Sequence, residues 1–246
     1  MSEQLADNSL AEEAYVILRE RILRGELPIG QVISRRKIAS ELGMSMLPVA
    51  EALLRLELEG LLESRPRAGT RVRVPSEQDV RGHYVVREAL EVQAAKLFAE
   101  VATPRERSEL QKLAARVDML YAQGQKNQGN YLLFLGVHEK LHRRIAEGTH
   151  CQALVEAIEK NHALASTWLC VPRAEVLNEP VRRHSELVKT LVTGTPAAAA
   201  KAMSAHIQAA LEHTLHRLET HFQHRESTLK IFTRSEKKPK KQGVIA

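Results

Sequence analysis

The chain has 246 residues, a length that suits one large domain or two modest ones, and its formal net charge is +6. Hydrophobic residues make up 43% of it and charged residues 27%, which excludes a wholly disordered chain. Two cysteines without CxxC spacing exclude a disulfide framework and a thiolate zinc finger, and no apolar run is long enough for a transmembrane helix. The acidic N-terminal stretch lacks the apolar centre of a signal peptide, so we expect a cytoplasmic protein.

The excess positive charge is concentrated near the C-terminus. Residues 1–75 contain 11 basic and 11 acidic side chains, whereas residues 224–246 contain 7 basic and 2 acidic side chains. We interpret residues 224–246 as a basic, disordered tail, with a non-specific contact to nucleic acid as the alternative. Evidence for DNA binding therefore has to come from local patterns and not from the net charge.

Residues 1–75 show the pattern of a winged helix-turn-helix. A capping box formed by Ser9 and Glu12 predicts the start of the first helix. Glycines and prolines then separate short amphipathic segments. The pattern predicts helices over 9–25, 34–43 and 45–60, followed by short strands over 61–64 and 70–74.

The remainder of the chain has helical periodicity throughout. Its predicted helices cover residues 77–101, 104–125, 129–147, 151–169, 175–193 and 196–223. Short connections between six helices predict an antiparallel bundle over residues 76–223. The fold class is therefore mainly α, with an N-terminal winged helix-turn-helix and a C-terminal six-helix bundle.

The winged helix-turn-helix predicts a DNA-binding surface. In this motif the N-terminal residues of the helix after the turn meet base edges in the major groove, and basic side chains nearby contact phosphates. The positions expected at base edges are Ser45, Met46, Leu47 and Ala50. The expected phosphate contacts are Arg35, Arg36 and Lys37 in the second helix and Arg65, Arg67 and Arg71 in the hairpin. A solvated basic face is the alternative, which we favour less because two patches flank one recognition helix.

Several segments of this domain resemble a known family. The runs LPIGQVI, IASELGMS, PVAEALLRLELEGLL and RAGT are similar to the winged-helix domain of GntR-family transcription regulators. Residues 77–222 resemble the all-helical, FCD-like effector domain of the FadR-type branch of that family. The resemblance implies a homodimer on a double-stranded operator, with Gly69 and Thr70 of the wing at the DNA, and a small carboxylate or sugar-acid effector.

The recognition helix departs from the family pattern. Met46 and Ala50 stand where family members usually carry arginines that face DNA. A bidentate contact from arginine to guanine contributes about 1–3 kcal/mol of discrimination, whereas an apolar side chain can contact a thymine methyl. We therefore expect an operator unlike the usual family sequence, with more dependence on the wing and on phosphate contacts.

A histidine motif in the bundle allows two interpretations. His138, Glu139 and His142 spell HEKLH, which matches the HExxH signature of zinc hydrolases with Glu139 as general base. A zinc-dependent hydrolase is thus the alternative function. We favour it less, because a six-helix bundle attached to a DNA-binding domain does not offer the expected catalytic fold.

The family resemblance implies a metal site instead. Metal-binding members carry Asp-x-x-x-His on one helix and one histidine on each of two later helices, which implies His142, His184 and His206 here, with His138 in place of the aspartate. An all-imidazole set suits zinc, nickel or copper better than magnesium or calcium, and zinc is our first choice. In one alternative His138 is a spare and the other three bind; in another the metal only holds the bundle together.

Arg87 is the predicted effector-binding residue. It matches a family arginine near the cavity and can pair with an effector carboxylate. The alternative is an ion pair with Glu91, four residues later on the same helix. We interpret Trp168 as a core residue and His162 as an ordinary surface or partly buried histidine.

Overall fold

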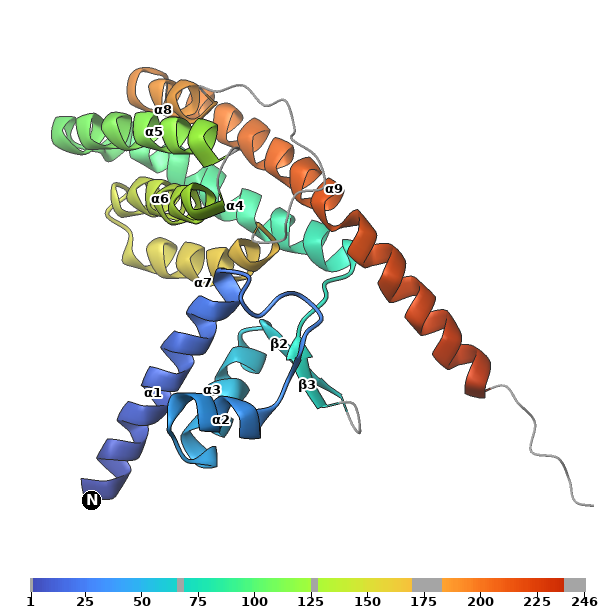
Figure 1. The fold of residues 1–246 in the computed structure, drawn as a ribbon. Helices are drawn as coiled ribbons and strands as arrows, with labels where there is room; N and C mark the ends of the chain where they lie inside the picture. The colour runs from blue at the N-terminus through green and yellow to red at the C-terminus, as the bar shows by residue number, and fades with distance from the viewer. Residues whose placement is uncertain (1, 66–68, 125–127, 170–182, 237–246) are drawn as a thin grey trace, which may run out of the picture.

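The computed structural model describes residues 2–65, 69–124, 128–169 and 183–236, which form a small α/β unit below a helical bundle (Figure 1). Buried hydrophobic residues of one cluster fall within 14–72, and those of a second cluster fall within 80–218. Arg67 and residues 237–246 lie outside the described residues. No helix in the described ranges combines the length and the apolar character that crossing a membrane requires.

The N-terminal unit has the predicted winged helix-turn-helix order. Its elements are α1 (Ser2–Leu23), β1 (Val32–Ile33), α2 (Arg35–Leu42), α3 (Met46–Leu58), β2 (Leu62–Arg65) and β3 (Gly69–Val72). The predicted start at Ser9 is wrong, since α1 already begins at Ser2. Leu and Ala among residues 2–8 favour helix, which lets the helix continue through the expected cap.

The strands form a three-stranded antiparallel sheet in the order β1-β3-β2. Leu62 lies opposite Val72, and Arg65 lies opposite Gly69 at the open end of the hairpin. Gly69 has φ +76°, a left-handed conformation that glycine adopts without steric cost. Sequence periodicity did not reveal β1 because a two-residue strand has no measurable alternation.

The helix-turn-helix geometry depends on two local features. The Ser34 hydroxyl accepts a hydrogen bond from the Lys37 backbone N–H at 3.3 Å, which confirms the predicted start of α2. Gly43 closes α2 in the left-handed conformation with φ +64°. Buried Leu18, Val49 and Leu56 then pack α3 against α1, which leaves the opposite face of α3 at the surface.

The six predicted helices of the bundle are all present. They are α4 (Glu77–Val101), α5 (Pro104–Gly124), α6 (Gln128–Glu147), α7 (Gln152–Leu169), α8 (Arg183–Thr193) and α9 (Pro196–Glu236). The predicted start of the fifth bundle helix, residue 175, falls outside the described residues. Because α9 continues to Glu236, a disordered tail does not begin at residue 224. Figure 1 shows α9 extending well beyond the other helices.

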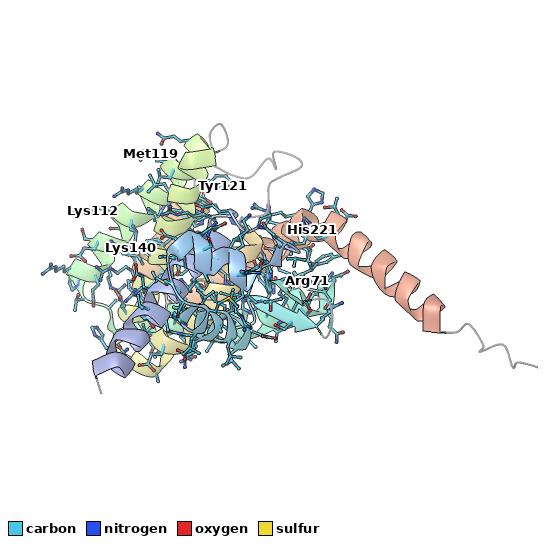
Figure 2. All side chains as sticks on the ribbon, turned by 60° about the horizontal axis from the view of Figure 1, so that its bottom comes forward. Arg71, Lys112, Met119, Tyr121, Lys140 and His221 are labelled. Atoms are coloured by element: carbon cyan, nitrogen blue, oxygen red, sulfur yellow. The ribbon has the colours of Figure 1, made fainter. Side chains whose placement is uncertain are left out.

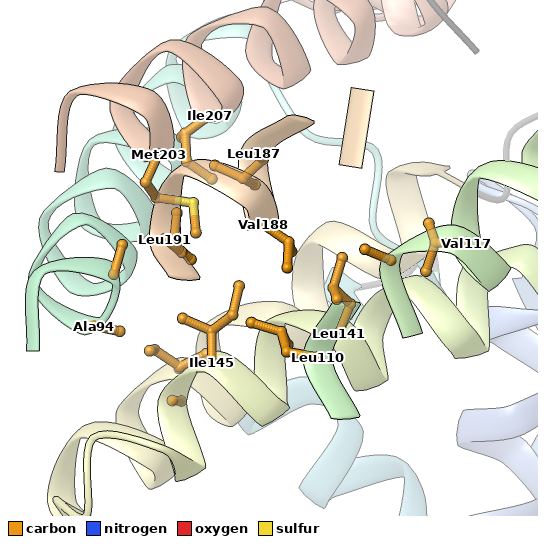
Figure 3. Packing of buried hydrophobic residues seen from close by; sticks show 14 of the residues in the cluster. Ala94, Leu110, Val117, Leu141, Ile145, Leu187, Val188, Leu191, Met203 and Ile207 are labelled. Atoms are coloured by element: carbon orange, nitrogen blue, oxygen red, sulfur yellow. The ribbon is translucent and has the colours of Figure 1, made fainter. Parts of the chain in front are cut away.

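The bundle core is mostly aliphatic and includes buried residues from all six helices, with Ile158 contributed by α7. Leu110, Leu141, Leu191 and Met203 are almost fully buried and come from α5, α6, α8 and α9, and Ala94 adds α4 (Figure 3). This packing fixes the inward faces of α6, α8 and α9. Histidines at inward positions of these helices are therefore forced into the interior.

Candidate functional sites: a buried histidine cluster and a winged-helix surface

The structure brings the four predicted metal ligands together. His138 and His142 lie one turn apart on α6, His184 lies in the first turn of α8, and His206 lies on α9. The ring centroid of His138 lies 4.6 Å from that of His142 and 5.0 Å from that of His184. The centroid of His206 lies 5.3 Å from that of His142 and 5.2 Å from that of His184. Four imidazole rings from three helices thus face one another inside the bundle, with His138 partly buried and the other three buried.

The nitrogen positions suit a metal ion. Nε2 of His138 lies 3.1 Å from Nε2 of His142, and ring nitrogens of His138, His142 and His206 all lie within 4.8 Å of one another. Two nitrogens on a tetrahedral zinc, with bonds of about 2.0–2.1 Å, lie about 3.3 Å apart. The spacing on α6 is therefore close to what two ligands of one metal ion require.

His206 gives the most direct test of whether a metal fits. The residue is only 7% exposed, and both of its ring nitrogens are buried without a hydrogen-bond partner. A buried polar group left in this state costs about 1–3 kcal/mol, and such groups in native proteins usually bind an ion or a water molecule. A metal ion between the four rings would satisfy one of the two nitrogens.

Three of the imidazoles are in the protonation state that metal binding needs. Burial lowers the pKa of His138 and of His206 well below the usual value, and neighbouring histidines lower both further. Burial lowers the pKa of His142 to about 4, although the Glu91 carboxylate opposes this shift. All three rings are neutral at pH 7, so a metal ion would not have to displace a proton from a charged imidazolium.

Two carboxylates orient the rings from outside the cluster. Glu91 on α4 forms a short hydrogen bond with Nδ1 of His142, and Asp118 on α5 lies 2.9 Å from Nδ1 of His184. Burial alone would raise the pKa of Asp118, but hydrogen bonds from His184 and Ser185 hold it below its usual value. Carboxylate partners of this kind fix the tautomer of a metal-binding histidine. Sequence reasoning missed both roles because the partners lie 51 and 66 positions away.

Arg87, the predicted effector contact, lies in a buried ion pair. Its Nε donates to Oε1 of Glu91 at 2.6 Å, and both side chains are nearly inaccessible. The structure therefore contains the Arg87–Glu91 ion pair that the sequence allowed as the alternative. A contact between Arg87 and an effector stays a prediction. Despite burial, the Arg87 charge, nearby His142 and His162, and the hydrogen bond with His142 hold the pKa of Glu91 well below its usual range.

His162 is more than the ordinary histidine that the sequence indicated. It is buried, and its Nε2 lies 2.8 Å from Oε1 of Glu91. Glu91, His142 and His162 form a second group with metal-binding geometry. We place a metal at the four histidines instead, because the Arg87 guanidinium bound to Glu91 would repel a second cation. Glu139, the general base of the hydrolase interpretation, belongs to neither group.

Further buried polar groups lie where α4 packs against α7, at His83 and Asn161. His83 lies two turns before Glu91, and its ring meets that of Trp168 edge-on at 4.9 Å. Trp168 is 3% exposed and part of the core, as the sequence indicates. Nε2 of His83 and Oδ1 of Asn161 are buried without hydrogen-bond partners. Burial lowers the pKa of His83 to about 4, and the nearby Arg87 charge adds to the shift.

A surface cleft of about 270 Å³ lies apart from this interior site. It opens between α5 and α6 and is lined by Lys112 and Lys140, among others (Figure 2). None of the four clustered histidines lines it. We therefore do not connect it with the histidine cluster.

The predicted base-reading residues lie at the surface. Met46 and Leu47 are 49% and 56% exposed, Ser45 is exposed, and Ala50 is half-buried. The predicted phosphate contacts in α2, Arg35, Arg36 and Lys37, are exposed as well. The exposed N-terminal end of α3 is thus apolar and is flanked by a basic α2.

The wing carries an acidic residue whose effect the sequence analysis missed. Arg71 on β3 (Figure 2) donates through Nε to Oε1 of Glu63 at 2.6 Å, and Arg65 lies 3.4 Å from Oε2 of the same carboxylate. Thr70 is hydrogen-bonded to Ser64 at 3.0 Å, and Gly69 is exposed at the start of β3. Glu63 stands just before the hairpin arginines that suggested a basic patch. One carboxylate therefore offsets two wing arginines.

Comparison with known families gives two matches that together cover most of the chain. Residues 10–72 match the family described as bacterial regulatory proteins, gntR family. Residues 83–209, which include all four clustered histidines, match the FCD domain.

Individual relatives agree with these matches. The chain is 29% identical over 216 residues to a protein of Paenarthrobacter nicotinovorans named "Probable D-xylose utilization operon transcriptional repressor", covering 87% of this chain and 93% of the relative. It is 23% identical over 199 residues to the HTH-type transcriptional repressor RspR of Escherichia coli K12, covering 80% and 85%. A GntR-type regulator from Rhodococcus sp. RHA1 has the same fold, with a TM-score of 0.71 at 22% identity over 84% of this chain and 98% of the other.

The buried histidines with lowered pKa should make the metal-free protein less stable as the pH is lowered from 7 to 5. Unfolded histidines take up protons near pH 6.5, whereas His83 and His142 resist protonation down to about pH 4. Between these pH values the unfolded state binds more protons than the folded state. Each such histidine therefore lowers the free energy of unfolding by about 1.4 kcal/mol for each pH unit by which the pH decreases. Urea unfolding at pH 7 and pH 5 should show a smaller loss for His83→Gln than for wild type. An equal loss in both proteins, or the same reduction in a His216→Gln control, would contradict this explanation.

Replacement of Glu63 should strengthen binding to DNA. Glu63→Gln releases Arg65 and Arg71 from their shared carboxylate and removes a negative charge from the wing. We expect roughly a two- to tenfold increase in affinity for duplex DNA at low salt and a steeper dependence on salt concentration. Fluorescence anisotropy across a salt series measures both quantities. Glu20→Gln on α1 removes the same charge elsewhere in the domain, and an equal effect of the two variants would refute a local role of Glu63.

Proposed function

Because the chain belongs to the GntR family of bacterial regulatory proteins and carries an FCD domain, we propose that it is a cytoplasmic, ligand-responsive transcription regulator with a metal centre. Residues 1–75 bind operator DNA, and residues 76–223 bind the metal and the effector and form a homodimer. Two winged helices in one dimer read the two halves of a roughly two-fold operator.

The convergence of four imidazole rings, three of them buried and one partly buried, is the observation that carries the proposal. His138, His142, His184 and His206 would hold a divalent transition metal, and an imidazole set suits zinc first and nickel next. When bound, the metal supplies a positive centre that attracts an oxygen of the effector. The protein residues orient the rings, keep them unprotonated and exclude bulk water.

The charge of the site favours an anionic effector. Imidazole ligands carry no negative charge, so they would leave the charge of a dication uncompensated, and the buried Arg87 nearby is already paired with Glu91. We therefore propose a small carboxylate or a sugar acid, with Arg87 as a second contact for its carboxylate. The relative whose name refers to D-xylose utilization supports an effector derived from a sugar.

The hydrolase interpretation of HEKLH does not stand. The matched family consists of transcription regulators and not of enzymes. His138 and His142 of the motif are explained by the four-histidine cluster, and Glu139 is not needed.

The operator is proposed to be recognised through apolar and phosphate contacts. Met46 and Leu47 present apolar side chains where base edges are expected, and Arg35, Arg36 and Lys37 flank them. Apolar contact at these positions favours thymine, because its methyl group lies in the major groove.

Metal content of the purified protein tests the metal centre. We expect about one zinc or nickel ion per chain, and His206→Ala should lower the affinity at least tenfold by removing one ligand. His216→Ala removes an exposed histidine from the same helix and serves as the matched control. Elemental analysis after dialysis against a metal buffer gives the numbers; full occupancy in His206→Ala would contradict the assignment.

A screen of small acids tests the effector. In the metal-loaded protein, a cognate carboxylate or sugar acid at 100 times its Kd should stabilise the fold by about 2.7 kcal/mol, and the resulting rise in Tm should disappear after chelation. A bundle in which the metal is only structural predicts instead that chelation unfolds the protein and that no acid raises Tm. Thermal shift with and without a chelator distinguishes the two cases.

Selection of binding sites from random DNA tests the recognition helix. We expect the selected half-sites to contain thymine at the positions facing Met46 and Leu47 and to differ from the usual family operator. The double variant Met46→Arg/Ala50→Arg should shift the selection toward guanine. Recovery of the usual family operator by the wild type at normal affinity would contradict this expectation.

A further inference from the structure

We propose that Asp118 on α5 positions His184 for metal binding, an inference that rests on the proposed metal centre. Asp118 is 6% exposed and lies 66 positions before its partner in the sequence. Its two carboxylate oxygens are divided between two neighbouring residues at the start of α8. The carboxylate thereby has two tasks, and Oδ1 takes part in both.

One task is to cap α8. Oδ1 accepts from the backbone N–H of His184 at 3.0 Å, and Oδ2 accepts from the backbone N–H of Ser185 at 2.9 Å and from its hydroxyl at 2.6 Å. The first N–H groups of a helix have no partner within the helix and attract a negative charge. A carboxylate from a different helix supplies that partner here, so α8 begins at a place that α5 determines.

The second task concerns the imidazole. Oδ1 also lies 2.9 Å from Nδ1 of His184, so Nδ1 donates to the carboxylate. Nε2 then carries the lone pair that can bind a metal ion. The ring centroid of His184 lies 5.0 Å from that of His138 and 5.2 Å from that of His206. Capping and ring orientation together fix both the backbone and the side chain of one ligand.

Asp118 also adds charge to the centre. No lysine or arginine among the described residues pairs with it, whereas Glu91, the carboxylate partner of His142, is offset by Arg87. Within the described part of the chain, Asp118 is therefore a carboxylate that touches the cluster without a lysine or arginine beside it. An outer carboxylate of this kind raises the basicity of its histidine and strengthens the metal bond.

Asp118→Asn and Ser185→Ala separate the two tasks. Both variants weaken the cap, but only Asp118→Asn removes the charge behind the His184 ring. Titration of the full chain with cobalt(II), followed by its visible absorption, measures affinity and ligand geometry together. We expect Asp118→Asn to bind cobalt about 10- to 100-fold more weakly and with a changed spectrum. Ser185→Ala should keep the spectrum and an affinity within about twofold of wild type, even where Tm falls.

The outcomes distinguish this inference from the proposed function. If wild type binds no cobalt, the metal centre itself is overturned. If wild type binds and Asp118→Asn shows the same affinity and spectrum, only the role of Asp118 is overturned. Should Asp118→Asn fail to fold, nitrogen-15 NMR of zinc-loaded wild type decides the matter: the inference requires a proton on Nδ1 of His184, and a proton on Nε2 overturns it.

Discussion

The buried carboxylate of Glu91 holds the polar interior of the bundle together. It accepts from Arg87 on its own helix, from His142 on α6 and from His162 on α7. A carboxylate in an apolar core is tolerated only when several donors replace its lost hydration, and loss of one partner leaves an uncompensated charge. The positions of three helices are thereby fixed around one ionised group, and the His142 ring is turned so that Nε2 faces the other histidines.

The position of α4 connects this interior to the winged helix. The same helix that carries Glu91 is capped by Ser76, where a capping box with Asp79 fixes its first turn. Asp79 also lies 3.1 Å from Nη2 of Arg73, the residue that follows β3. A displacement of α4 at the histidine cluster would therefore reach the end of the sheet directly. An effector that favours one placement of α4 would shift the winged helix by its difference in affinity for the two placements.

Patterns that act within a few residues were readable from the sequence. Amphipathic periodicity and the glycine and proline breakers predicted the winged helix and the six bundle helices, and the i, i+4 spacing of His138 and His142 placed both on one face of α6. Contacts between distant residues were not readable. Glu91, Asp118 and His162 acquire their roles only when α4, α5 and α7 pack against the histidine helices, and Glu63 pairs with Arg71 only across a strand register. The convergence of His184 and His206 was implied by family resemblance and not by spacing alone.

The central claim is that one metal ion is bound by imidazoles from α6, α8 and α9. X-ray absorption at the metal edge, recorded on full-length protein purified without a histidine tag, reports the ligand atoms directly. Coordination by His138, His142, His184 and His206 predicts a first shell of nitrogen at about 2.0–2.1 Å, with the multiple-scattering pattern of three to four imidazoles. A shell dominated by carboxylate oxygen or by sulfur, or protein that contains no metal after equilibration with zinc, would contradict it.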